Sequence, residues 1–222
     1  MFKSIVWSST IDYPEQISTV LFVDICNWKC SFCHNYNLND NNSIDFQKDI
    51  LPKLIDRKEF INHIIISGGE CTLYPKLIDI IKQLKGNGFV VGIHTNGSNP
   101  TFLKEVIPLI KFVGMDIKTS KSKYNLITQT DVDYTYIIKS IELIVKSGIN
   151  YDFRTTVYPK YVDLNDCLEI ANLLCQFKAN KYVLQQYDNS FDKSMIEPYP
   201  IKYLKEIQTE CNKIIPTFIK GW

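Results

Sequence analysis

Short apolar runs rich in β-branched residues alternate with longer segments of helical period along most of this chain. The apolar runs predict six strands, at 18–25, 62–67, 89–95, 111–117, 151–157 and 181–186. The remaining periodic segments predict helices at 46–58, 75–86, 101–109, 134–147, 164–177 and 200–213. Six β/α units in succession indicate an α/β fold with a parallel sheet, either open and doubly wound or curved into a barrel or part of one.

The length and charge of the chain narrow the classes of protein to which it can belong. With 222 residues, 45% of them hydrophobic, it can bury a single core, and we expect one domain over residues 1–222. Its 25 basic and 24 acidic residues leave a formal net charge of +1, so we expect no general affinity for nucleic acid or for an anionic membrane. We find no secretory signal and no apolar stretch that approaches the roughly 20 residues of a membrane span. We therefore expect a cytoplasmic protein, whose seven cysteines are reduced.

Three of those cysteines and a histidine fall within nine positions, in the stretch CNWKCSFCH. Cys30, Cys33 and His34 have the spacing of a c-type haem attachment site, which the expected compartment disfavours. With Cys26 included, the stretch is consistent with a zinc site of three thiolates and one imidazole, or with an iron–sulfur site that lacks one ligand.

Polar residues mark the carboxyl end of every predicted strand, which is where functional residues gather in parallel α/β folds. They are Cys26, residues 67–70, residues 94–97, residues 116–118, residues 154–156 and residues 185–187. Because a structural zinc site needs no such surroundings, this pattern favours the iron–sulfur interpretation.

The iron–sulfur interpretation leaves room for a small ligand. Three thiolates can hold three irons of a 4Fe-4S cluster, so that the fourth iron is open to a ligand that is not protein. Gly68 and Gly69 let the backbone approach such a ligand, and the Glu70 carboxylate suits an ammonium group. Lys118 and Arg154 can face a carboxylate. An amino acid lying against the open iron fits these residues.

Two motifs of this chain resemble those of a known superfamily. The stretch CNWKCSFCHN resembles the CxxxCxxC motif of the radical S-adenosylmethionine (SAM) enzymes, and SGGECT resembles their GGE motif. The resemblance implies a partial (β/α)6 TIM-like barrel of the radical SAM type, with Cys26, Cys30 and Cys33 as ligands of a 4Fe-4S cluster that has one open iron. It also implies that SAM binds that iron and contacts Gly68, Gly69, Glu70, Thr95, Asn96, Asp116, Lys118, Arg154 and Gln186.

Within the superfamily, Phe32 and the pair His34 and Asn35 resemble the glycyl radical enzyme activating proteins. STIDYPEQISTVLFVDICNWKCSFCHN, VGMDIKTSKSKY, DFRTTV and YVLQQY together are similar to the activating proteins of anaerobic (class III) ribonucleoside-triphosphate reductase. The resemblance implies reductive cleavage of SAM and a glycyl radical on the reductase large subunit, with electrons from a low-potential donor such as flavodoxin or ferredoxin.

Two other enzyme functions and a non-enzymatic one stay open as alternatives. The enzymes are a pyruvate formate-lyase-type activase and a small-molecule radical SAM enzyme such as 7-carboxy-7-deazaguanine synthase. A plain iron–sulfur or zinc carrier would leave Glu70, Lys118 and Arg154 without a purpose.

Two positions depart from the family pattern. Cys71 stands where proline is usual, and we expect it to be a packed small thiol. His94 stands where activating proteins commonly have an aspartate that helps to hold a monovalent cation. We also expect His34 to donate a hydrogen bond to cluster sulfide, and the irregular stretches 34–45 and 187–199 to border an opening that admits a loop of the partner.

Overall fold

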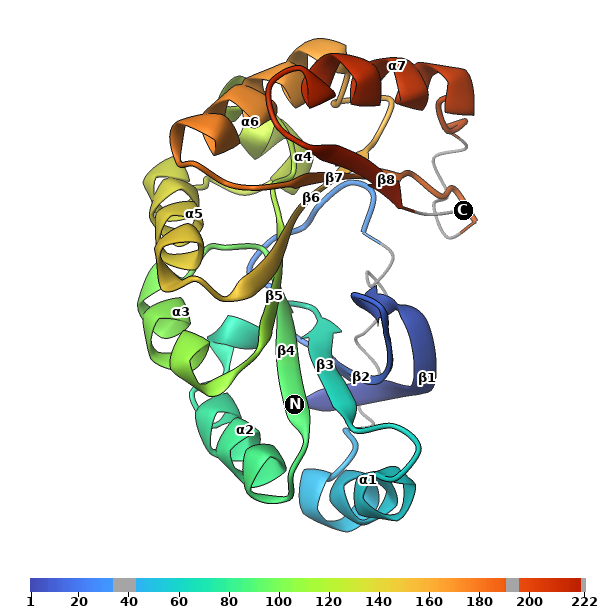
Figure 1. Cartoon of the computed structure of the whole chain (residues 1–222), viewed down its shortest axis with the longest axis vertical. Coiled ribbons are helices and arrows are strands. Elements are labelled where there is room, and N and C mark those ends of the chain that lie inside the picture. Colours follow the sequence, from blue (N-terminus) through green and yellow to red (C-terminus); the bar gives the residue numbers. More distant parts are fainter. Residues whose placement is uncertain (34–42, 191–195, 221–222) are drawn as a thin grey trace. The chain divides into compact units, whose positions relative to one another are not determined.

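A computed structural model describes residues 1–33, 43–190 and 196–220, and these form two compact units. Unit 1 comprises Met1–Asn27, Asn35–Thr95 and Thr101–Gly114, and unit 2 comprises Trp28–His34, Asn96–Pro100 and Met115–Trp222. Across the described residues, the order of strands in the sheet follows the sequence from β1 to β8 (Figure 1). Within these ranges, the structure has no helix long and apolar enough to cross a membrane.

Unit 1 contains the first strands and the helices that connect them. Its strands are β1 (Phe2–Tyr13), β2 (Gln16–Val23), β3 (His63–Gly68), β4 (Val90–Thr95) and the start of β5 (Phe112–Asp116). Strand β1 is antiparallel to β2, whereas β2, β3 and β4 are parallel. The helical segments are η1 (Phe46–Ile50), α1 (Leu51–Arg57), η2 (Cys71–Leu73), α2 (Leu77–Gly86), η3 (Ile107–Leu109) and α3 (Pro100–Val106), of which Pro100 belongs to unit 2.

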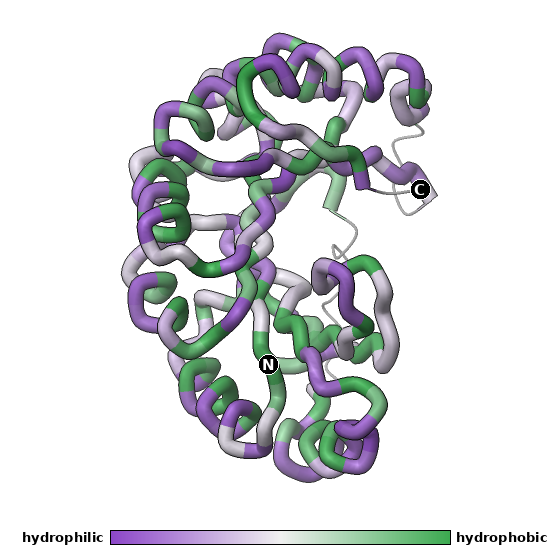
Figure 2. The backbone as a smooth tube through the Cα atoms, viewed as in Figure 1, coloured by the Kyte–Doolittle hydropathy of each residue, from purple (hydrophilic) through white to green (hydrophobic). Residues whose placement is uncertain are grey.

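The core of unit 1 explains why its central strands are continuously apolar. Ile64, Ile65 and Ile66 of β3 are all fully buried, as expected for a parallel strand covered on both faces. Helix α2 instead buries one stripe, and Figure 2 shows the alternation of apolar and polar residues along it. The carboxyl ends of β2, β3 and β4 are thereby held in fixed register.

Unit 2 contains the end of β5 and the rest of the chain. Its elements are η4 (Lys121–Lys123), α4 (Tyr124–Thr128), α5 (Tyr134–Ser147), β6 (Asn150–Val157), α6 (Leu164–Gln176), β7 (Tyr182–Gln186), α7 (Ile201–Asn212) and β8 (Thr217–Lys220). Strands β6, β7 and β8 are parallel, and α7 packs against α6 and β8 (Figure 1). Asp163 forms a capping box with Asp166 at the start of α6, and Gly148 ends α5 with φ 69°.

The predicted elements agree with the structure in type and order, and the structure adds several short elements and one strand. The six predicted strands correspond to β2–β7, and the six predicted helices correspond to α1, α2, α3, α5, α6 and α7. The prediction missed β1, the short helix α4, the four-residue strand β8 and the 3-10 segments η2 and η4. It also extended the first strand to residue 25, whereas β2 ends at Val23, so that Asp24 and Ile25 belong to the segment that leads to Cys26.

Candidate functional site

The carboxylate of Glu70 lies at the carboxyl end of β3 in unit 1 and is completely buried. Its oxygen Oε1 accepts hydrogen bonds from the backbone N–H of Thr72 (3.1 Å), the Thr72 hydroxyl (2.5 Å) and the Thr95 hydroxyl (2.8 Å). Thr95 is the last residue of β4, so two neighbouring strand ends fix this carboxylate. Thr72 was not among the predicted site residues; a hydroxyl two positions after the glutamate was the available signal.

Gly68 and Gly69 are required for close packing of the chain against itself. A Cβ atom on Gly69 would lie 2.0 Å from the carbonyl oxygen of Ile25, and one on Gly68 would lie 2.5 Å from backbone atoms of Val23. Gly68 also has φ +107°, a conformation that side chains disfavour. The structure therefore gives these glycines a packing role: they let the turn after β3 pack on the segment that precedes Cys26. Their approach to a ligand stays a prediction.

Cys71 is buried, as expected for a packed small thiol. Its Sγ donates to the carbonyl oxygen of His94 (3.3 Å). Burial and then the nearby Glu70 charge raise the pKa of the Cys71 thiol well above its usual value. A protonated, enclosed thiol of this kind is not available as a ligand.

The imidazole of His94 links three parts of unit 1. Its Nδ1 lies 3.2 Å from the Ser67 hydroxyl, and its Nε2 lies 3.1 Å from the backbone oxygen of Asp12. The ring also packs edge-on against Phe112, with centroids 6.3 Å apart. His94 thus ties β1 to the ends of β3 and β4, which is a structural role for this residue.

Residues just before Cys26 contact the segment that follows Gly69. The backbone N–H of Glu70 donates to the carbonyl oxygen of Ile25 (2.7 Å), and the backbone N–H of Ile25 donates to the Tyr74 hydroxyl (3.0 Å). The Tyr74 hydroxyl in turn donates to the Asp24 carboxylate. Tyr74 was absent from the predicted site, because a tyrosine at the end of a short 3-10 turn has no motif of its own.

The second half of the cysteine stretch belongs to unit 2, where α4 anchors it. The backbone N–H groups of Lys29 and Ser31 donate to the carbonyl oxygens of Thr128 and Ile127, each at 3.0 Å. The N–H of Cys33 donates to the carbonyl oxygen of Cys30 (3.1 Å), which closes a turn between the two thiols. The carbonyl groups at the end of α4 therefore hold this loop in place.

Two buried aromatic residues add to that anchoring. The ring of Trp28 packs edge-on against Tyr124 (centroids 5.7 Å apart), and the ring of Phe32 packs against Tyr158 (5.2 Å). Both side chains therefore attach the loop to unit 2 through buried apolar contacts.

Asp116, Lys118 and Arg154 form one ion-paired group at the ends of β5 and β6. Asp116 Oδ1 accepts from Arg154 Nε (2.8 Å) and Nη2 (2.7 Å), while Asp116 Oδ2 accepts from Lys118 Nζ (2.9 Å). Desolvation lowers the pKa of Lys118, but the charges of Asp116, Cys30 and Cys33 outweigh it, and the net pKa is raised. Two cations share one carboxylate, so the group keeps one net positive charge beside the cysteine loop.

Asn96 directly follows β4 and Gln186 is the last residue of β7, and both residues belong to unit 2. Asn96 Oδ1 accepts from the backbone N–H of Ser98 (2.9 Å), which makes the Asn96–Gly97 pair a turn. Gly97 has φ +76°, and a Cβ there would lie 2.2 Å from Met115 Cε. Gln186 Nε2 donates to the carbonyl oxygen of Tyr199 (3.4 Å).

The three predicted cluster cysteines differ from most of the others in exposure. Cys26 is exposed and Cys30 and Cys33 are partly exposed, whereas Cys71, Cys167 and Cys211 are buried; Cys175 is exposed on α6. Cys26 belongs to unit 1 and the other two belong to unit 2. Among the residues that the structure describes, no three His, Cys, Asp or Glu side chains form a group that could hold a metal ion, and convergence of the three thiolates stays a prediction. His34 and Asn35 lie outside the described residues, as do 36–42 and 191–195 of the two irregular stretches.

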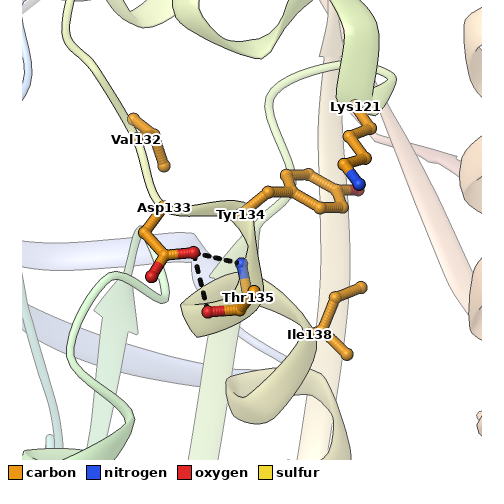
Figure 3. A pocket seen from close by; sticks show the side chains of 6 residues that line it. All are labelled: Lys121, Val132, Asp133, Tyr134, Thr135 and Ile138. Atoms are coloured by element: carbon orange, nitrogen blue, oxygen red, sulfur yellow. Dashed lines mark hydrogen bonds between the residues drawn. The ribbon is translucent and has the colours of Figure 1, made fainter.

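A surface pocket of about 300 Å³ lies beside the start of α5 in unit 2 (Figure 3). Its lining residues are Lys121, Val132, Asp133, Tyr134, Thr135 and Ile138. The Asp133 carboxylate accepts from the backbone N–H (2.9 Å) and the hydroxyl (2.7 Å) of Thr135, and so caps the helix. The pocket includes none of the predicted site residues.

Comparison with known proteins identifies the family. The model of the radical SAM superfamily matches residues 20–174. The chain is 34% identical over 228 residues to the "Putative glycyl-radical enzyme activating enzyme MJ1227" of Methanocaldococcus jannaschii, covering 99% of this chain and 93% of that protein. It is 26% identical over 226 residues to the pyruvate formate-lyase-activating enzyme of Clostridium pasteurianum, covering 95% of this chain and 92% of that enzyme.

Solved structures agree on the fold. SuiB of Streptococcus suis, bound to the precursor peptide SuiA, superposes with a TM-score of 0.74 at 16% identity over 91% of this chain. The match takes in 48% of SuiB, so the chain spans about half the length of that protein. Likeness at this identity shows the fold, and it confirms the predicted α/β partial barrel of the radical SAM type. The family model covers most of the chain and the first relative matches almost its whole length, and the chain therefore belongs to the radical SAM superfamily and, within it, to the glycyl-radical enzyme activating enzymes.

Proposed function

We propose that this activating enzyme generates a glycyl radical on the large subunit of an anaerobic (class III) ribonucleoside-triphosphate reductase, using SAM and a 4Fe-4S cluster held by Cys26, Cys30 and Cys33. The observation that carries the site proposal is Glu70, a fully buried carboxylate fixed by Thr72 and Thr95 at the strand ends. Burial of a carboxylate costs free energy unless hydrogen bonds and a cationic partner compensate for the lost water. The ammonium group of a ligand would be such a partner.

The residues present fit the cofactors that the family implies. The cysteines of the CxxxCxxC stretch are thiols outside the buried core, and the Lys118 ammonium lies beside their loop, 5.6 Å from the centroid of the Phe32 ring. Thiolates next to a cation are the donor set that an iron–sulfur cluster requires. When bound, the reduced cluster and SAM supply the one-electron chemistry that ends in methionine and 5'-deoxyadenosine.

The protein's own residues bind and orient SAM in this proposal. Glu70 accepts hydrogen bonds from the ammonium group, and Thr95 holds Glu70 in position. The net positive charge of the group formed by Asp116, Lys118 and Arg154 attracts the carboxylate. Gly68, Gly69, Asn96 and Gln186 complete the proposed contacts.

Sequence similarity supports the choice of partner. The stretches at 9–35, 113–124, 152–157 and 182–187 are similar to activating proteins of the anaerobic reductase. The likeness to the pyruvate formate-lyase-activating enzyme of Clostridium pasteurianum supports the second candidate, pyruvate formate-lyase. Membership of the activating enzymes favours either protein partner over a small-molecule substrate such as that of 7-carboxy-7-deazaguanine synthase. We further propose that flavodoxin or ferredoxin supplies the electrons.

A comparison of the two candidate partners, each in its own sample, tests this proposal. Anaerobically reconstituted enzyme, reduced flavodoxin and SAM are mixed with the reductase large subunit or with pyruvate formate-lyase, and the samples are frozen for electron paramagnetic resonance. We expect a glycyl radical on the reductase and none on the lyase. A reductase whose radical glycine is replaced by alanine is the control. A radical on the lyase alone would support the second candidate and overturn the first.

A further inference from the structure

The three residues that precede Cys26 all contact one short segment, Gly69 to Tyr74, and these residues belong to unit 1. Asp24 is also held by Met1, whose carbonyl oxygen accepts its backbone N–H at 3.1 Å. The backbone N–H of Gly69 donates to the carbonyl oxygen of Val23 (3.0 Å), and the N–H of Glu70 donates to that of Ile25 (2.7 Å). These two hydrogen bonds fix the backbone carbonyl groups of Val23 and Ile25, just before Cys26.

The Tyr74 hydroxyl contacts two further groups of the same segment. It accepts the backbone N–H of Ile25 at 3.0 Å and donates to the Asp24 carboxylate. One phenolic oxygen therefore fixes both the main chain and the side chain immediately before Cys26. The Ile25 side chain is 56% exposed, so packing of that side chain does little to restrain this position.

The same segment carries Glu70, whose carboxylate is fixed by Thr72 and Thr95. From these contacts we infer that Tyr74 is a positioning residue for Cys26: its hydroxyl sets the place of this cysteine relative to Glu70. The inference rests on the proposed assignment of Cys26 as a cluster ligand and of Glu70 as the SAM ammonium partner. It adds a residue that acts on the cluster site through the backbone of Ile25.

A purely structural tyrosine would affect overall stability without affecting Cys26 in particular. The distinguishing measurement is the alkylation rate of each cysteine in the cluster-free full-length protein, resolved by peptide mass spectrometry. Tyr74→Phe keeps the ring and removes the hydroxyl. We expect alkylation of Cys26 to rise about three- to tenfold, the change in local opening that follows the loss of one or two hydrogen bonds. Cys30 and Cys33, held by α4, should keep the parental rate.

Tyr151→Phe is the matched control. The Tyr151 hydroxyl also accepts a backbone N–H, that of Asn180 at 2.9 Å, but it lies in unit 2. This variant should leave the labelling of all three cysteines unchanged. Asp24→Ala, which removes the acceptor of the phenol, should raise Cys26 labelling in the same direction by a smaller factor, and melting curves of all variants verify folding.

A second readout uses the reconstituted protein. The electron paramagnetic resonance line shape of the reduced cluster should change in Tyr74→Phe and stay parental in Tyr151→Phe. Parental Cys26 labelling together with a parental line shape in Tyr74→Phe would overturn the inference, and so would equal acceleration at all three cysteines. Neither readout involves the partner, so failure here is distinct from failure to form the glycyl radical.

Discussion

At the scale of single residues, the position of the Glu70 carboxylate and its charge can be separated experimentally. The donors on Oε1 come from Thr72 and Thr95, and a glutamine side chain keeps an oxygen that can accept these bonds. A substitution at this residue therefore reports on the charge with little disturbance of its surroundings.

We predict that Glu70→Gln weakens SAM binding about ten- to a hundredfold, because one charge-assisted hydrogen bond of about 1.5–3 kcal/mol is lost. Iron content should not change. Equilibrium binding of SAM to the reconstituted protein measures the effect, with Glu105→Gln on the exposed face of α3 as the control. Binding equal to that of the parent would show that Glu70 does not contact the ammonium group.

Gly69 allows a second test at this scale. Gly69→Ala places a Cβ 2.0 Å from the carbonyl oxygen of Ile25, and the backbone must move to relieve the clash. We expect a loss of about 1–3 kcal/mol in the free energy of unfolding, measured by chemical denaturation, and reduced iron uptake. Gly86→Ala, with open space at its Cβ position, should be neutral or gain about 0.5–1 kcal/mol. Equal stability of the two variants would argue against tight packing at Gly69.

At the scale of helices and strands, periodicity predicted the elements that bury a regular face and missed those that do not. Helix α4 is only five residues long and β8 only four, too short to display a period. Strand β1 carries a usable signal in FKSIVWSSTIDY, which is rich in β-branched and aromatic residues, but it precedes the first β/α unit and is antiparallel. Its role in holding His94 depends on tertiary contacts that no local pattern contains.

The strands of unit 2 also contain a charge group that stabilises them. The Asp152 carboxylate of β6 is largely buried and accepts from Lys181 (2.7 Å) and Lys220 of β8 (2.5 Å). Burial alone would raise the pKa of Asp152, but the two lysines outweigh it and lower the pKa.

We predict that Asp152→Asn lowers the free energy of unfolding at neutral pH by about 1–3 kcal/mol, less than for a fully buried pair because both lysines are partly exposed. The folded-state pKa lies below the unfolded value of about 3.9, so the stabilisation is complete above that pH and is lost as the pH falls through the folded-state pKa. Denaturation curves should converge for parent and variant at low pH. A difference that does not depend on pH would contradict this assignment. Glu142→Gln, in an exposed pair with Lys146, should change stability by less than about 0.5 kcal/mol.

At the scale of the whole molecule, the sequence predicted the α/β class, the superfamily and the residues that end each parallel strand. It did not predict what holds those residues in place. The carbonyl groups of Ile127 and Thr128 under the cysteine loop, and the Tyr74 hydroxyl beside Ile25, act through contacts between distant segments. Such contacts leave no spacing or period in the sequence.

The metal content tests the cofactor proposal for the chain as a whole. Protein reconstituted without oxygen should contain about four irons per chain and show a resonance signal on reduction that changes when SAM is added. Cys30→Ala should abolish the four-iron form and leave the fold largely intact, because this partly exposed loop thiol adds little to the core. Cys175→Ser, at an exposed thiol of α6, is the control that should bind iron normally. Stoichiometric zinc without iron uptake would contradict the proposal.

In the proposed reaction a hydrogen atom moves from the partner's glycine to 5'-deoxyadenosine, and isotope labelling can follow that atom. The reductase large subunit is prepared with deuterium on the Cα of its radical glycine and mixed with reduced enzyme and SAM under anaerobic conditions. Mass spectrometry of the small-molecule products should show one deuterium in 5'-deoxyadenosine, formed with methionine in step with the glycyl radical. Unlabelled 5'-deoxyadenosine, together with a reductase that carries no radical, would show that the enzyme does not take hydrogen from this partner.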